Sequence, residues 1–145
     1  MNEIEDVNLY IFYLRLSYNM LNANTVFFRS AILCTAPGGS IVYSTSTLSP
    51  IQNDGVVSLA LKQIWEETNI DMAVCDLSIT IQPFKPMMKF AQNTKFGQLV
   101  MPQISQNFGP MYISKLKRLN WNSFYSEDFL TKIGLFYESL IHSIV

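Results

Sequence analysis

Three consecutive turn residues, Pro37-Gly38-Gly39, divide the first half of the chain into a helical and an extended part. Proline cannot continue a helix, and glycine supplies the positive φ that a tight turn needs. The preceding segment, 22–35, predicts a helix, because five apolar residues fall on one face at helical spacing: Val26, Phe27, Ala31, Ile32 and Leu33. The following segment, 40–44, has the strand-type sequence Ser-Ile-Val-Tyr-Ser. A helix that turns sharply into a short apolar strand is half of an α/β unit.

A second helix start follows that strand. Ser49 is in position to serve as N-cap, Pro50 fits the first helical position and Gln52 stands at N3, which together form a capping box. The helix is expected to run to about Glu67. Its apolar face is formed by Val56, Val57, Ala60, Leu61, Ile64 and Trp65.

The remaining segments are less regular. Residues 71–81 and 111–116 predict strands, and 82–110, rich in Pro, Gln, Asn and Gly, predict a long loop with short structured pieces. Residues 124–145 predict an amphipathic helix with Ser126 as N-cap, and residues 1–18 fit a helix or a strand. The order of elements favours a parallel α/β sheet whose last strand, reached by a loop, pairs antiparallel.

The composition is that of one modest domain with few charges. The chain has 145 residues, of which 49% are hydrophobic and 14% charged, so disorder is excluded. Either the domain has an unusually apolar surface, or it is part of a larger sheet. No apolar run is long enough to span a membrane, the acidic start does not predict a targeting segment, and two cysteines and one histidine give no metal-binding spacing.

The charges are unevenly distributed. Residues 77–126 contain no acid and six bases, namely Lys85, Lys89, Lys95, Lys115, Lys117 and Arg118. Such a stretch would suit an RNA backbone. The alternative is that the bases are scattered over several elements and form no single patch.

A loop of small hydroxyl residues, Ser44 to Thr47, lies between the strand and the second helix. Ligands bind at this position in open α/β sheets, where the helix N-terminus offers N–H groups and a positive dipole. Serine and threonine are also common in ordinary loops, because they cap helices and make turns. The spacing alone favours the ordinary loop.

The segment Pro37-Gly38-Gly39-Ser40-Ile41-Val42-Tyr43-Ser44-Thr45-Ser46-Thr47-Leu48 closely resembles the signature of RsmB/NOP/Sun-type RNA cytosine-C5 methyltransferases, Pro-Gly-Gly, apolar residues, Tyr-Ser-Thr-Cys-Ser/Thr-Leu. Three further segments, 97–102, 107–112 and 117–119, resemble the C-terminal end of the mitochondrial ribosomal-RNA branch of that family. The resemblance covers roughly residues 26–119. It leaves 1–25 unassigned and 120–145 as a separate tail helix.

The resemblance implies a fold and a mechanism. The fold would be the C-terminal portion of a Rossmann-like, class I S-adenosylmethionine-dependent methyltransferase domain, with an incomplete sheet and an antiparallel last strand. In the family a cysteine of this loop attacks C6 of cytosine, and C5 then takes the methyl group of S-adenosylmethionine. Ser46 occupies that cysteine's position, and a hydroxyl needs an adjacent general base that the loop does not supply. Cys34 and Cys75 are expected to be small core residues rather than replacements.

The family's cofactor-binding half is also missing from this sequence. No glycine precedes Pro37, so the glycine-rich turn of a Rossmann-type cofactor site has no place there. We therefore expect no productive binding of S-adenosylmethionine by this chain alone.

Three functions remain open. The chain could be a truncated, catalytically impaired RNA cytosine-C5 methyltransferase of mitochondrial ribosomal RNA. It could instead be a non-catalytic module that binds RNA or a protein partner, or a non-functional product. The resemblance implies a mitochondrial location, which the acidic start of the sequence does not support.

Overall fold

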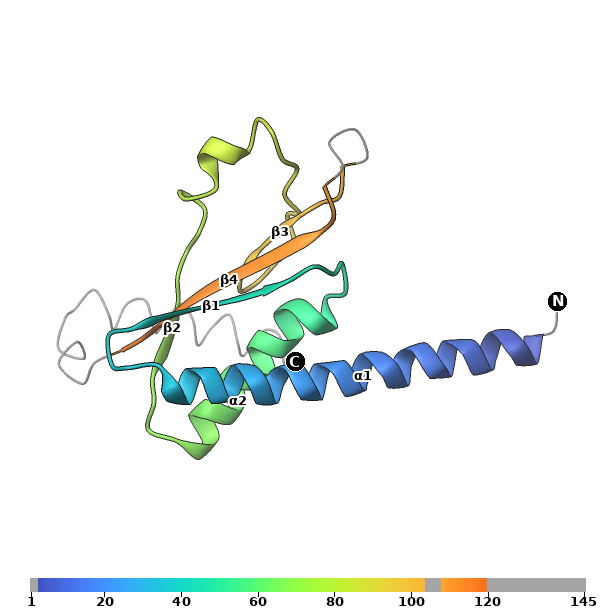
Figure 1. The fold of residues 1–145 in the computed structure, drawn as a ribbon, viewed down its shortest axis with the longest axis horizontal. Helices are drawn as coiled ribbons and strands as arrows, with labels where there is room; N and C mark the ends of the chain where they lie inside the picture. Colours follow the sequence, from blue (N-terminus) through green and yellow to red (C-terminus); the bar gives the residue numbers. More distant parts are fainter. Residues whose placement is uncertain (1–2, 104–107, 120–145) are drawn as a thin grey trace.

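The computed structural model describes residues 3–103 and 108–119, which form two helices packed on one face of an antiparallel sheet (Figure 1). The main elements are α1 (Glu3–Cys34), β1 (Ser40–Thr45), η1 (Ile51–Gly55), α2 (Val56–Glu67), β2 (Met72–Val74), η2 (Gln82–Phe84), β3 (Gln98–Val100) and β4 (Met111–Arg118). The predicted tail helix, 124–145, lies outside the described residues.

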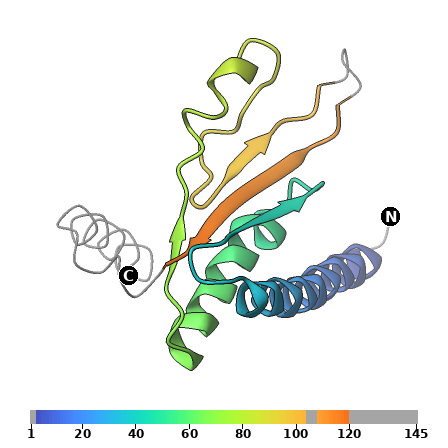
Figure 2. The ribbon, with the colours of Figure 1, turned by 60° about the vertical axis from the view of Figure 1, so that its left-hand side comes forward.

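The first helix is much longer than the predicted segment 22–35. It spans 32 residues and takes up the segment 3–18 that fitted either a helix or a strand. The sequence did carry a signal for a helix there, because Ile4, Val7, Ile11, Leu14 and Tyr18 follow alternating steps of three and four residues. Its half nearest the N-terminus projects beyond the sheet in both ribbon views (Figures 1 and 2).

The buried face of α1 differs from the predicted one. Thr25, Phe28 and Ile32 are buried, whereas Val26 and Phe27 are 61% and 75% exposed. The same three-and-four spacing selects the buried residues, whereas the predicted face started one residue too late. α1 ends at Cys34, and Gly38 turns the chain with a φ of 78°. The predicted role of the Pro-Gly-Gly turn is thus confirmed.

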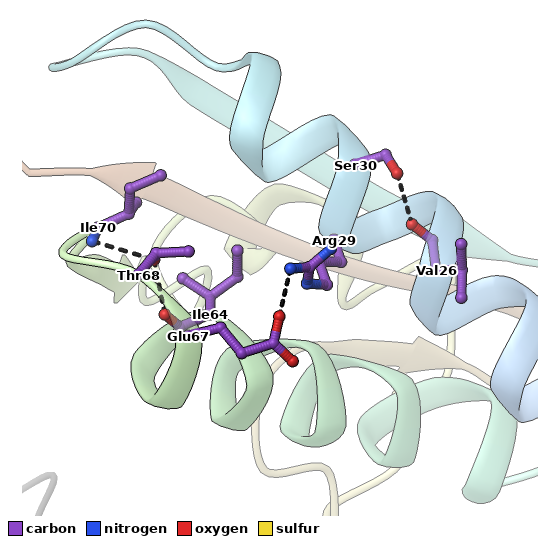
Figure 3. Close-up of polar contacts among 7 residues, drawn as sticks. All are labelled: Val26, Arg29, Ser30, Ile64, Glu67, Thr68 and Ile70. Atoms are coloured by element: carbon purple, nitrogen blue, oxygen red, sulfur yellow. Dashed lines mark hydrogen bonds and ion pairs between the residues drawn. The ribbon is translucent and has the colours of Figure 1, made fainter.

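The second helix packs against α1 through the predicted apolar face. Val56, Val57, Ala60 and Ile64 are buried, while Trp65 at the edge of that face is 61% exposed. Figure 3 shows an ion pair between Arg29 of α1 and Glu67 near the end of α2. Both side chains are partly exposed, so the pair adds at most about 1 kcal/mol of stability.

The sheet is organised around β4. The strand order is β1-β4-β2, β3 also pairs with β4, and every pairing is antiparallel. The predicted antiparallel last strand is confirmed, and it lies between β1 and β2, which run in the same direction without being neighbours. The predicted strand 71–81 shortens to Met72–Val74, and its continuation forms turns.

The helices and the sheet share one core. Tyr112 and Leu116 of β4 are completely buried under α1 and α2, and Ile41 and Tyr43 of β1 pack against the same cluster. The ring centroids of Phe28 and Tyr43 lie 4.9 Å apart. The opposite face of β1 and β4 carries the exposed side chains of Val42, Lys115 and Lys117. Among the described elements, both long helices lie on the same side of the sheet (Figure 2).

Candidate functional site

The hydroxyl loop lies where the sequence predicted it, between the carboxyl end of β1 and the first helical turn that follows. Ser44 and Ser46 are exposed, and Thr45 and Thr47 are half-buried. Ser46 therefore presents its hydroxyl to solvent at the end of the strand. Within residues 3–103 and 108–119, no side chain or backbone group bonds that hydroxyl.

The side chain of Asn53 is hydrogen-bonded to the hydroxyl loop 44–47. Its side chain is buried, with 2% exposure, and its amide group donates to the carbonyl of Thr47 at 3.0 Å. Its amide oxygen accepts from the hydroxyl of Thr45. The hydroxyl of Thr47 in turn accepts from the backbone N–H of Ser49 at 3.1 Å. These bonds fix the residues on both sides of Ser46.

The predicted capping box is wrong. The helix begins with a π turn, η1, in which the N–H of Gly55 donates to the carbonyl of Pro50 at 3.0 Å. No side chain caps it, and the carbonyl of Ser49, not its hydroxyl, accepts from the N–H groups of Gln52 and Asn53, each at 3.1 Å. The N-cap position of this helix is therefore Pro50, one residue after the predicted N-cap Ser49. Two of its donors are already used, so they are not available to the anion suggested by the sequence.

Asp54 connects the site to a second loop. Its carboxylate accepts from the backbone N–H groups of Lys95 at 2.7 Å and Phe96 at 3.0 Å, and from the hydroxyl of Tyr112. Burial, together with the hydrogen bond to Asp54 and its charge, raises the pKa of Tyr112 far above its usual value. Tyr112 therefore remains a neutral donor that locks β4 to η1.

Neighbouring residues of one π turn thus hold two loops: Asn53 holds 44–47 and Asp54 holds 94–97. π turns are rare and are frequent at functional sites. The sequence reasoning did not identify either residue. The available signal was an Asn-Asp pair inside a segment otherwise expected to form the first turn of an apolar helix.

Neither cysteine replaces the family nucleophile in this loop, and the expectation that both are core residues is wrong. Cys34 is exposed at the end of α1, before the amino end of β1, whereas Ser46 follows its carboxyl end. Cys75 is half-buried and lines a cavity of about 360 Å³ with Asp76, Lys95 and Gly97. Its backbone continues the pairing of β2, donating to the carbonyl of Lys115 at 2.8 Å.

The bases of the acid-free stretch do not form one patch. Lys115 and Lys117 share the open face of β4, and the guanidinium of Arg118 donates to the carbonyl of Thr35 at 2.6 Å. Lys85 and Lys89 lie in the segment after β2, and the amine of Lys95 is 5.4 Å from the ring centre of Phe96. A contact with RNA would therefore involve a few of these residues rather than all six.

In the described part of the chain, no three His, Cys, Asp or Glu side chains gather in a way that could hold a metal ion. None of the helices described is both long enough and apolar enough to cross a membrane.

The similarity to known proteins agrees with the motif. No protein-family model matches the chain. It is 42% identical over 90 residues to the 5-cytosine rRNA methyltransferase NSUN4 of Mus musculus, a match that covers 62% of this chain and 24% of that protein. It is 39% identical over 92 residues to the 5-cytosine rRNA methyltransferase nsun-4 of Caenorhabditis elegans, covering 62% of this chain and 20% of that protein.

A third relative modifies transfer RNA. The chain is 41% identical over 91 residues to the mitochondrial tRNA (cytosine(34)-C(5))-methyltransferase of Mus musculus, covering 62% of this chain and 25% of that protein. The chain thus spans about a quarter of the length of the curated relatives it matches. Over the matched part, the predicted resemblance to RNA cytosine-C5 methyltransferases is confirmed.

Proposed function

We propose that this chain is the part of an RNA cytosine-C5 methyltransferase that carries the loop facing the target base, and that by itself it does not complete the reaction. The observation that carries the proposal is the loop 44–47. It follows the strand of the family motif, it is held on both sides by Asn53, and it exposes Ser46 at the nucleophile position. Ribosomal RNA is the proposed substrate, because two of the relatives named above are rRNA methyltransferases.

The chemistry at position 46 explains the proposed impairment. Ordinary thiols have a pKa near 8.5, so a few per cent are thiolate at neutral pH, whereas a hydroxyl needs a base to remove its proton. No titratable side chain bonds Ser46 among the described residues. Ser46 is therefore proposed to contact the RNA base without forming a covalent bond to it.

The residues present do not fit S-adenosylmethionine. A Rossmann-type site presents free N–H groups of a glycine-rich turn and of the helix that follows. After β1 the turn is built of Ser and Thr, and the N–H groups of Ser49, Gln52 and Asn53 are bonded within the loop and η1. We derive no step through the cofactor, and we propose that this chain does not bind it alone.

The test is a calorimetric titration of the purified chain with S-adenosylmethionine, alone and with ribosomal RNA, together with an assay of methyl incorporation. The mouse rRNA methyltransferase serves as the positive control. We expect no cofactor heat and no methylation. Methyl incorporation by this chain would refute the proposed impairment.

A Ser46→Cys variant distinguishes the effect of the missing cysteine from the effect of the missing cofactor site. In a Cys34→Ser, Cys75→Ala background, we expect the new thiol to react readily with iodoacetamide, because position 46 is exposed, and still to support no methylation. Methyl transfer by this variant would show that the serine is the single defect. An unreactive thiol would contradict the exposed position.

We also propose a mitochondrial location. The supporting observation is that one relative's name gives it as mitochondrial. The test is to express the full-length parent gene product as a fluorescent fusion and to compare its location with that of a mitochondrial dye. A diffuse signal would oppose the proposal.

The second candidate is a non-catalytic module that binds RNA or a protein. Lys115 and Lys117 favour RNA, since both are exposed on the open face of β4. RNA binding without cofactor binding in the same titration would support this function.

A further inference from the structure

Residues 76–97 leave the sheet after β2 and return to it before β3 (Figures 1 and 2). Where the two ends of this segment come together, they enclose a cavity of about 360 Å³. At one end, the N–H of Cys75 donates to the carbonyl of Lys115 at 2.8 Å. At the other end, Gln98 pairs with Ile113, two residues away on β4. Sites for small ligands start at about 300 Å³, so this cavity is large enough for a single nucleobase.

The cavity is lined by apolar side chains and by polar groups without a partner. Val74, Leu77 and Phe96 form the apolar part of the lining. The amide of Gln98 and the hydroxyl of Thr94 make no hydrogen bond with any of the described residues. An amide and a hydroxyl both donate and accept hydrogen bonds, so they can pair with the edge of a base while the apolar side chains contact its face.

Asp76 adds an ionised carboxylate to the lining. It is exposed, and its Oδ1 atom accepts from the N–H of Ser78 at 2.8 Å. Hydrogen bonds from the side chain and the backbone of Ser78 hold the pKa of this carboxyl group below its usual value. A carboxylate only accepts hydrogen bonds, so it selects a ligand group that donates. The exocyclic amines of adenine, cytosine and guanine are such donors, whereas uracil has no exocyclic amine.

The cavity lies close to the hydroxyl loop. Ser44, Ile113 and Gln98 are register partners across three strands, so their side chains share the open face of the sheet. Neighbouring strands are about 4.8 Å apart, so roughly 10 Å separate the backbones of Ser44 and Gln98. A strand of RNA that places a base at Ser46 would therefore pass the cavity within a short distance.

The same π turn fixes the cavity wall and the hydroxyl loop. Asp54 accepts from the N–H groups of Lys95 and Phe96, and Asn53 holds the residues around Ser46. The wall and the loop are thus held at a fixed separation, as a preformed binding site requires.

We propose that this cavity binds one amino-bearing base of single-stranded RNA near the target cytosine, through Asp76 and Gln98. The place beside a target cytosine rests on the proposed function, whereas the preference for an exocyclic amine rests on the lining alone. Proteins commonly recognise single-stranded RNA by hydrogen bonds to the edges of its bases and by contacts with their faces. Lys115, exposed on the open face, would contact a phosphate of the same strand.

The experiment measures fluorescence anisotropy of labelled oligocytidylate and oligouridylate of about eight nucleotides with the purified chain. The two pyrimidines differ at position 4, where cytosine has an amine and uracil a carbonyl. Asp76→Asn is the decisive variant, because it removes a negative charge and would strengthen binding if only electrostatic attraction mattered. Asp71→Asn is the matched control, since it makes the same charge change directly before β2 and outside the cavity lining. Gln98→Leu is a second variant that removes the amide.

We expect oligocytidylate to bind about tenfold more tightly than oligouridylate, the effect of one hydrogen bond to a charged group. Asp76→Asn and Gln98→Leu should each abolish most of this preference, and Asp71→Asn should keep it. Circular dichroism must show the same fold in these variants, and Asp76→Asn alone decides if Gln98→Leu does not fold. Equal affinities for the two oligonucleotides, tighter binding by Asp76→Asn, or no binding by any form would overturn the proposal.

The Ser46→Cys variant described above tests the proposed function separately. Oligocytidylate should protect this thiol from iodoacetamide if the target base lies at position 46. A preference for oligocytidylate without protection would refute the placement of the target base at Ser46 and leave the cavity as an RNA site.

Discussion

Asn53 is the residue on which the geometry of the hydroxyl loop depends most. It makes two hydrogen bonds to the loop from a buried position in η1, directly before α2. Ser46, the residue marked by the family motif, makes none within the described part of the chain. The residue that positions the loop is therefore distinct from the residue that faces the substrate.

Asn53→Ala is expected to destabilise the fold by about 1–3 kcal/mol, because the hydroxyl of Thr45 loses its acceptor and the carbonyl of Thr47 loses its donor. Ser46→Ala is the control and should change stability by less than about 0.5 kcal/mol, since the side chain is exposed. Urea denaturation followed by tryptophan fluorescence measures both. Equal effects would show that Asn53 does not organise the loop.

Asp71 gives a pH-dependent prediction. Burial raises the pKa of this carboxyl group above its usual value, so the folded state favours the protonated form. The resulting stability is fully present below the unfolded pKa and is lost as the pH rises through the raised folded pKa. Asp71→Asn should therefore be more stable than the parent at pH 7, and the difference should vanish near pH 3. Thermal melts at the two pH values test this, and a variant less stable at pH 7 would contradict it.

The helices, the turn and the strand in the first half of the chain were largely predictable from local sequence patterns, but the geometry of the helix start and the strand order were not. The Pro-Gly-Gly turn, the strand after it and the apolar face of α2 follow from turn chemistry and helical spacing. The π turn did not follow, because Ser49, Pro50 and Gln52 fit a regular capping box and nothing local reveals that Asn53 and Asp54 bond to distant loops. The position of β4 between β1 and β2 was likewise not predictable, because it depends on contacts between residues far apart in the sequence.

A substitution at Gly97, directly before β3, tests how closely this segment packs against β4. A Cβ atom at this position would collide with the carbonyl oxygen of Ile113 and would lie 2.8 Å from Cζ of Tyr112. Gly97→Ala should therefore destabilise the protein by about 1–3 kcal/mol, because a backbone atom and a buried ring must both move. Gly109→Ala is the matched control, since a Cβ there meets nothing within 4 Å. Denaturation midpoints that shift equally would contradict this reading of the contact.

At the scale of the whole molecule, the described residues form a sheet with one face covered by helices, and none of the described strands pairs with the outer edge of β1. This arrangement accounts for the apolar composition, for which the sequence left two explanations. Phe27 and Val42 are exposed beside the open edge of β1, which favours membership of a larger sheet over a merely apolar surface. The sequence could not decide between these explanations, because composition does not show where apolar residues lie.

The open face also gives a prediction about RNA. If Lys115 and Lys117 each contact one phosphate of single-stranded RNA, replacing both with Gln should reduce the slope of log K against log salt by about 1.4. Lys62→Gln is the control, because Lys62 lies on α2 beside Glu66. Fluorescence anisotropy at several salt concentrations measures the slope. An unchanged slope in the double variant would exclude this face from the RNA contact.

The π turn has a consequence for how this segment tolerates insertions and deletions. A π turn is an α-helical turn with one additional residue, and each residue advances a helix by about 100°. Deleting one residue within 51–55 would restore a regular helix while rotating Asn53 or Asp54 away from the loop that it holds. The extra residue allows adjacent side chains to face two different loops. Chains that share this site should therefore keep the length of this turn even where its sequence changes.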